Sequence, residues 1–225
     1  MWNLAAPPGF QGLREDQDLL IYVRKLPHWR QEGATYFVTF RLGDSLPQAR
    51  RRELAARRAQ WERGHPAPRC PEAWRDFSRR LMARDEGWLD EGFGTCDLKD
   101  PHASAAVAET MRRFDTVRYE LGALVVMPNH VHALVRPLAG KDDPLEAILH
   151  TWKRFSAREI NRRRGQVGPL WQRETFDRIV RDEEHLYRCI QYLGSNPGKA
   201  GFSSQSCRRW IRPEWKALGW GFVDR

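Results

Sequence analysis

The chain has 225 residues, 41% of them hydrophobic, which suits one globular domain with a core of its own and excludes a disordered chain. Its 38 lysines and arginines outnumber 29 acidic residues, so the formal net charge is +9. This excess favours polyanionic partners, but it does not define a chemistry.

Three further features restrict the class of protein. The cysteines have no paired spacing, so we expect neither a disulfide framework nor a zinc knuckle. The N-terminus lacks the basic start and apolar core of a secretory signal. No stretch approaches the roughly eighteen consecutive apolar residues of a membrane span. The sequence therefore predicts a soluble protein of a reducing compartment.

The first element expected is a strand over residues 34–42, which are rich in aromatic and β-branched side chains. Ser45 and Pro47 have the character of an N-cap and an early helical position, and they predict a basic helix over 48–64. After a proline-rich break, the pattern of 72–92 indicates another short helix.

The second half of the chain predicts a helix over 102–115 and two strands, over 119–127 and 130–138, that meet at a turn. A helix over 145–165, a loop entering a strand within 168–181, and a last helix complete the order. This order predicts an α+β fold, with a small antiparallel sheet and helices packed on one face.

The strand over 130–138 begins with the motif His-Val-His. Side chains alternate along a strand, so His130 and His132 share one face while Val131 points to the other. Two neutral imidazoles at this spacing can share one metal ion. The competing interpretation is that one or both only form hydrogen bonds at a sheet surface. A zinc hydrolase is disfavoured, because too few His and Asp ligands follow.

The last predicted helix runs from Asp182 to about Ser195, and Pro197 and Gly198 are expected to end it. Its apolar face consists of the residues at i, i+3, i+4 and i+7, namely Leu186, Cys189, Ile190 and Leu193.

The same helix adds a second set of polar residues. At about 100° per residue, His185, Tyr192 and Asn196 fall in one stripe along its flank. Asn196 offers an amide oxygen to a metal ion, and Tyr192 offers a hydroxyl beside that ion. Tyr187 with Gln191 is a rival pair at the same spacing, which would require a rotated helix.

A tyrosine, two histidines and an amide suit one reaction class. The phenolic oxygen attacks a phosphodiester while a metal ion offsets the developing charge, and a covalent phosphotyrosine link results. Histidine and amide ligands with bound water suit Mg²⁺ or Mn²⁺ without excluding zinc.

Five segments resemble the single-tyrosine HUH transposases, in particular the branch of REP-associated tyrosine transposases. They are ATYFVTFRL, VVMPNHVHALV, WKRFSAREIN, GPLWQRETFDRIVRDEEH and YLGSNPGKAGF, and they cover most of the chain from about Arg24 to Phe202. The resemblance implies a ferredoxin-like (RRM-like) fold and a metal-dependent endonuclease and strand-transferase acting on single-stranded DNA beside hairpins. It also implies a bacterial, cytoplasmic, nucleoid-associated protein without membrane contact that is a monomer or a homodimer.

Residue by residue, the resemblance makes His130 and His132 the HUH metal ligands, Tyr192 the nucleophile and Asn196 the amide ligand. The relatives would leave a 5′-phosphotyrosine and a free 3′-OH. Gly194 and Ser195 replace the bulkier residues often found before the Asn–Pro pair, so we expect a looser helix end. The implied organisation is a lead-in over 1–33, a catalytic domain over 34–202 with an insertion at about 53–97, and a tail over 203–225.

Candidate DNA contacts are basic and aromatic residues before the first strand, on the 145–165 helix and in the following loop and strand. They are Arg24, Lys25, His28, Trp29, Lys153, Arg154, Arg158, Arg173 and Arg178. His185 and Asp177 are candidates for orienting the metal ligands. Two alternatives stay open: a domesticated nucleic-acid-binding protein that no longer cleaves, and a metal protein without nucleophilic chemistry.

Overall fold

The computed structural model describes residues 4–23, 27–140, 143–202 and 207–223. Its main sheet has five antiparallel strands in the order β6-β3-β5-β4-β7. Their bounds are β3 (Tyr36–Arg41), β4 (Tyr119–Val126), β5 (His130–Pro137), β6 (Phe176–Ile179) and β7 (Arg208–Ile211). With α3 (Pro101–Arg112) and α4 (Leu145–Arg164), they follow the βαββαβ order of a ferredoxin-like fold, which confirms the predicted class.

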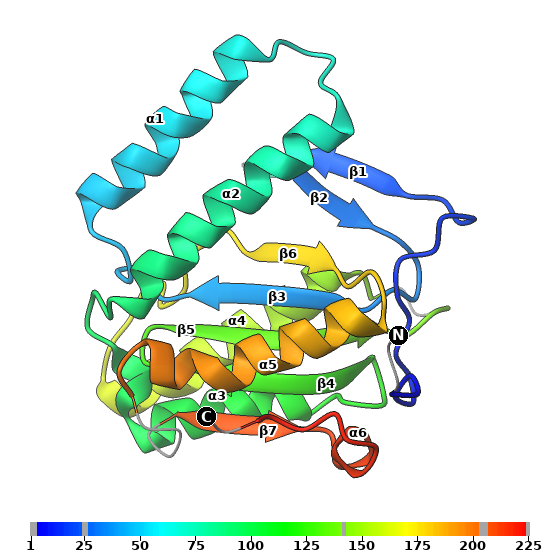
Figure 1. The fold of residues 1–225 in the computed structure, drawn as a ribbon. Coiled ribbons are helices and arrows are strands. Elements are labelled where there is room, and N and C mark those ends of the chain that lie inside the picture. The colour runs from blue at the N-terminus through cyan, green and yellow to red at the C-terminus, as the bar shows by residue number, and fades with distance from the viewer. Residues whose placement is uncertain (1–3, 24–26, 141–142, 203–206, 224–225) are drawn as a thin grey trace.

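One face of the sheet packs against α3 and α4 (Figure 1). Alternate residues of β5, namely Val131, Ala133 and Val135, are buried there with Trp152 of α4. This is the packing predicted from the alternation of side chains along the strand.

The opposite face is covered by α5 (Glu183–Lys199), whose axis runs roughly along the strands in Figure 1. Leu186, Ile190 and Leu193 of α5 pack against Phe37 and Leu134 in a second core. The predicted apolar face of this helix is therefore confirmed. The expectation that helices pack on one face holds for α3 and α4 but not for α5.

The end of α5 also differs from the prediction. Pro197 and Gly198 were expected to end the helix, but it continues through them to Lys199. Gly194 is buried, and a side chain added there would meet Phe222 at 3.0 Å. The small residue therefore admits the C-terminal segment against the helix, and α5 does not loosen at this point.

The N-terminal half carries a second, two-stranded sheet and a helical hairpin. The strands β1 (Leu20–Val23) and β2 (Pro27–Arg30) lie in the predicted lead-in, for which the sequence predicted no strand. The helices α1 (Gln48–Gly64) and α2 (Pro71–Asp90) form the hairpin, and α2 is longer than the short helix expected. Ser45 does not cap α1, because its hydroxyl donates to the Leu42 carbonyl instead.

The remaining elements are η1 (Asp97–Lys99) and α6 (Pro213–Ala217). The segment after Phe202, for which no element was predicted, adds β7 to the sheet beside β4. Among the described residues, no helix combines the length and the apolar character that crossing a membrane requires.

Candidate active site

His130 and His132 lie on the face of β5 that α5 covers, opposite Val131. Both side chains are buried, and their Nε2 atoms are 3.0 Å apart. The ring planes are inclined at 79°. The strand thus presents two imidazole nitrogens to one point, as the alternation of side chains predicted.

Each ring is oriented through its other nitrogen. Nδ1 of His130 lies 2.7 Å from Oδ1 of Asn129, and Nδ1 of His132 lies 2.7 Å from the hydroxyl of Thr39. The Asn129 amide nitrogen donates to the carbonyls of Leu89 and Phe93, at 3.2 and 3.1 Å. Its Oδ1 must therefore accept a hydrogen bond from Nδ1–H of His130, which leaves Nε2 of His130 with a lone pair.

The surroundings keep both imidazoles neutral. Burial, together with the nearby guanidinium of Arg41, lowers the pKa of His130 to about 3. Burial lowers the pKa of His132 well below its usual value, with smaller contributions from His130 and Arg178. Neutral imidazole is the form that binds metal ions.

Tyr192 of α5 packs against this pair. Its ring centroid lies 5.4 Å from that of His132 and 5.9 Å from that of Phe37. The ammonium of Lys199 lies 4.9 Å from the Tyr192 ring centroid. The rival Tyr187 instead contacts Trp220, at 6.3 Å between centroids. The geometry thus brings Tyr192 to the histidines and places Tyr187 elsewhere.

Asn196 is fully buried, and neither Oδ1 nor Nδ2 has a hydrogen-bond partner. It lies four residues after Tyr192, or about 6 Å along the helix. His130 lies two residues before His132, or about 6.6 Å along the strand. Figure 1 shows that α5 runs against the direction of β5, so Asn196 and His130 are displaced toward the same end of the sheet.

A buried amide without a partner, displaced toward the same end of the sheet as the two neutral imidazoles, is compatible with a divalent cation, because a buried polar group without a partner is costly unless a ligand satisfies it. His130, His132 and Asn196 are the residues that would hold this ion. Within the described part of the chain, no three His, Cys, Asp or Glu side chains are grouped as a metal site, so such a site depends on the amide.

The two predicted orienting residues lie apart from the pair. Asp177 does bind a histidine, but it is His28, at 2.6 Å, and it also pairs with Arg30 at 2.5 Å. Nδ1 of His185 accepts from the backbone of Arg181 at the start of α5. The side chains that do orient the pair, Asn129 and Thr39, were missed. Asn129 directly precedes His130, whereas Thr39 is identified only by the pairing of β3 with β5.

The predicted DNA contacts do not lie on one face of the sheet. Arg178 lies on the face of the histidines, with its guanidinium 4.7 Å from the Phe37 ring centroid. Arg154 and Arg158 are exposed on α4, which covers the other face, and Arg173 is exposed in the loop before β6. Arg24 and Lys25 lie outside the described residues.

Three other candidates for DNA contact are partly or fully buried, and two of them form hydrogen bonds within the protein. His28 is buried between Asp177 and Glu174, and both of its ring nitrogens are engaged. Nζ of Lys153 donates to the backbone carbonyls of residues 172–174, so it fixes that loop. Trp29 is half-buried and lines a cavity beside β6.

Comparison with known proteins supports the resemblance seen in the motifs. Over 92 residues the chain is 25% identical to a Haemophilus influenzae protein described as "Putative REP-associated tyrosine transposase". The chain resembles REP-associated tyrosine transposases. The match covers 37% of this chain and 52% of the relative, so the chain spans about half the length of that protein.

No protein-family model matches the chain. A solved structure of a REP-associated tyrosine transposase bound to a REP hairpin aligns with 82% of this chain and 76% of its own. The sequence identity is 17% and the TM-score is 0.39.

Proposed function

We propose that this chain is a metal-dependent DNA strand-cleaving and strand-joining enzyme, a transposase of the single-tyrosine HUH type. The observation that carries the proposal is the position of Tyr192, whose ring packs against His132 beside the paired Nε2 atoms. The orphaned amide of Asn196, one helical turn further along, supports a cation at the same place.

In the proposed reaction, the phenolic oxygen of Tyr192 attacks the phosphorus of a phosphodiester in single-stranded DNA. A new bond forms between that oxygen and phosphorus, and the bond from phosphorus to the 3′-oxygen breaks. The proton lost by the phenol is balanced by protonation of the 3′-oxygen, which leaves a 5′-phosphotyrosine and a free 3′-OH. Attack by another 3′-OH reverses these changes and joins strands without an external energy source.

The protein groups have separate tasks in this scheme. His130, His132 and Asn196 hold the cation, and Asn129 and Thr39 fix the orientations of the two rings. A bound Mg²⁺ or Mn²⁺ supplies positive charge that offsets the charge developing on the phosphate. Lys199 adds a further positive charge beside the Tyr192 ring.

The proposed substrate is single-stranded DNA next to a hairpin. The support for it is the net charge of +9 and the similarity to proteins whose descriptions name REP elements. A non-cleaving nucleic-acid-binding protein is the alternative, and it requires the same partner without the covalent step.

The test uses 5′- and 3′-labelled hairpin DNA with single-stranded flanks, incubated with full-length protein and Mg²⁺ or Mn²⁺. We expect a covalent protein–DNA adduct that is stable to denaturant, absent in EDTA and absent in Tyr192→Phe. Tyr187→Phe is the matched control and should form the adduct normally. Binding without an adduct across several hairpins and both metals would contradict the proposal and favour the non-cleaving alternative.

A further inference from the structure

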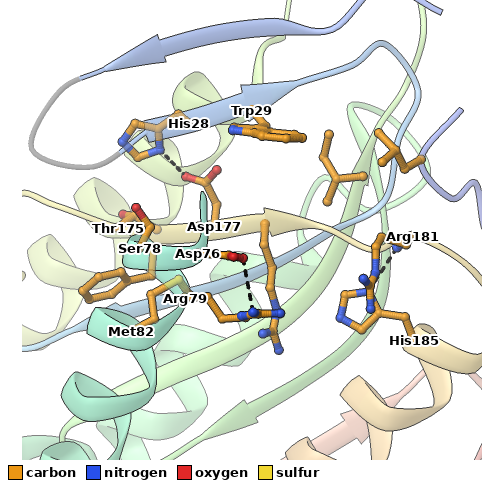
Figure 2. Close-up of a pocket in the computed structure, with 14 residues that line it drawn as sticks. His28, Trp29, Asp76, Ser78, Arg79, Met82, Thr175, Asp177, Arg181 and His185 are labelled. Atoms are coloured by element: carbon orange, nitrogen blue, oxygen red, sulfur yellow. Dashed lines mark hydrogen bonds and ion pairs between the residues drawn. The ribbon is translucent and has the colours of Figure 1, made fainter. Parts of the chain in front are cut away.

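A cavity of about 200 Å³ lies at the outer edge of β6, between β2, α2 and the start of α5. Figure 2 shows Trp29 at the top of this space, with Met82 and Arg79 below it and His185 to one side. Its volume is below the roughly 300 Å³ at which pockets for drug-sized ligands begin, so it suits a single planar ring. None of the proposed catalytic residues lines it.

The cavity is lined by apolar side chains, among them Leu13, Met82 and Phe176, and by polar groups that lack hydrogen-bond partners. Oγ of Ser78 and Nε of Arg178 are both buried there without a hydrogen-bond partner. Nδ1 of His185 accepts from a backbone amide, and burial, with the nearby arginines, lowers the pKa of His185 to about 4. The neutral ring therefore carries its proton on Nε2, as a donor. These groups match the pattern of a small-molecule site, in which a few polar atoms orient an apolar ring.

The charges around the cavity favour an anion attached to that ring. Arg79, Arg178 and Arg181 line it, together with two carboxylates. Both carboxylates are already paired: Asp76 with Arg79 at 3.2 Å, and Asp177 with His28 and Arg30. Arg178 and Arg181 are therefore positive charges in excess, as a phosphodiester at the mouth of the cavity would require.

Contacts connect this cavity to the candidate active site. The guanidinium of Arg178 lies over the ring of Phe37, and Phe37 contacts both His132 and Tyr192. Arg178 and Tyr192 therefore contact the same buried side chain, that of Phe37, which lies between the cavity and the candidate active site. Trp29 offers the flat aromatic surface on which an unpaired base stacks.

We infer that this cavity binds one unpaired base of the substrate strand, stacked on Trp29, with its phosphate held by Arg178 and Arg181. The inference rests on the proposed function, because it assumes that Tyr192 acts on single-stranded DNA. It adds a recognition site for a single nucleotide outside the cleavage centre.

The test measures binding of a hairpin with a single-stranded tail in EDTA, using Tyr192→Phe protein so that no cleavage occurs. An abasic residue replaces each tail base in turn. We expect one tail position at which the abasic residue weakens binding about ten-fold or more, as the loss of one stacked base predicts. In Trp29→Leu the intact tail should bind about as weakly, and the abasic residue at that position should have no further effect.

A second pair of variants guards against a folding defect in Trp29→Leu. Arg79 lines the cavity, whereas its neighbour Arg80 lies at a different surface beside Trp61 and Phe77. Arg79→Gln leaves the carboxylate of Asp76 unpaired in the cavity, where it repels the phosphate. The variant should therefore weaken tail binding several-fold more than Arg80→Gln, although both remove one charge from an exposed position of α2. Equal losses of tail-binding affinity in Arg79→Gln and Arg80→Gln would overturn the inference. It would also be overturned if the abasic residue weakened binding by the same factor in Trp29→Leu as in the protein that keeps Trp29.

The adduct assay separates failure of this inference from failure of the proposed function. If wild-type protein forms the adduct but shows no coupling between Trp29 and a tail base, the cavity is not a base site and the proposed chemistry stands. If the coupling is present and no adduct forms, the base site stands and the proposed chemistry is wrong.

Discussion

The Nε2 atoms of His130 and His132 face each other at 3.0 Å, and each ring is held at Nδ1 by a different neighbour. Asn129 accepts a hydrogen bond from His130, whereas the Thr39 hydroxyl can either donate a hydrogen bond to His132 or accept one from it. Both rings can therefore direct an Nε2 lone pair to one cation without moving. The two histidines are positioned before any ligand arrives.

The Thr39 hydroxyl should affect metal affinity although it is not a ligand. Thr39→Val removes the group that orients His132, and the loss of such an orienting partner typically weakens metal binding by about 10- to 100-fold. We expect this loss for Mn²⁺ in isothermal titration calorimetry. Thr151→Val is the control, since that hydroxyl donates to the Ala147 carbonyl of α4, across the sheet. Equal affinities in the two variants would contradict the assigned role.

The buried amide of Asn196 should lower the stability of the metal-free protein and stabilise the metal-bound protein. Its buried amide makes no hydrogen bond, so an apolar side chain of similar size removes a desolvation cost of about 1–3 kcal/mol. We predict that Asn196→Leu unfolds at the same temperature as wild type or higher in EDTA. Mn²⁺ should raise the unfolding temperature of wild type but not that of the variant. A variant that is less stable in EDTA and still stabilised by Mn²⁺ would show that the amide has a structural role only.

His28 makes stability depend on pH. Burial opposes its protonation, but hydrogen bonds with Asp177 and Glu174 outweigh burial and raise the pKa of His28 from 6.5 to about 9. Because the folded pKa lies above the unfolded one, the contribution of His28 is fully present below pH 6.5 and is lost as the pH rises through about 9.

Urea unfolding across this range should therefore show a decline in the free energy of unfolding, of roughly 1–3 kcal/mol, that His28→Gln lacks. The comparison removes the effect of Lys153, whose pKa burial lowers to about 8, because both proteins contain it. Parallel pH profiles would show that His28 binds no extra proton in the folded state.

The local part of the candidate site could be predicted from the sequence. The shared face of His130 and His132 follows from the two-residue period of a strand, and the stripe of Tyr192 and Asn196 follows from the helical period. The apolar positions of α5 also fixed which flank stays available, so Tyr192 was preferred to Tyr187. These inferences need only the geometry of one element at a time.

The rest depended on contacts between distant segments. Thr39 meets His132 through the register of β3 and β5, and Asn129 is fixed by carbonyls at the end of α2, a helix whose role had no sequence signal. The position of α5 on the second face could not be read from the order of elements either. Asp177 was expected to orient a metal ligand, but it binds His28 instead, a partner that became identifiable only once β2 lay beside β6.

Mapping of the covalent adduct decides whether Tyr192 is the nucleophile. Trypsin separates the two candidates, because Tyr187 falls in the peptide 182–188 and Tyr192 in the peptide 189–199. After nuclease and trypsin digestion of the adduct, mass spectrometry should find a nucleotide attached to the peptide 189–199, at Tyr192. A nucleotide on the peptide 182–188, or on neither peptide, would show that Tyr192 is not the nucleophile.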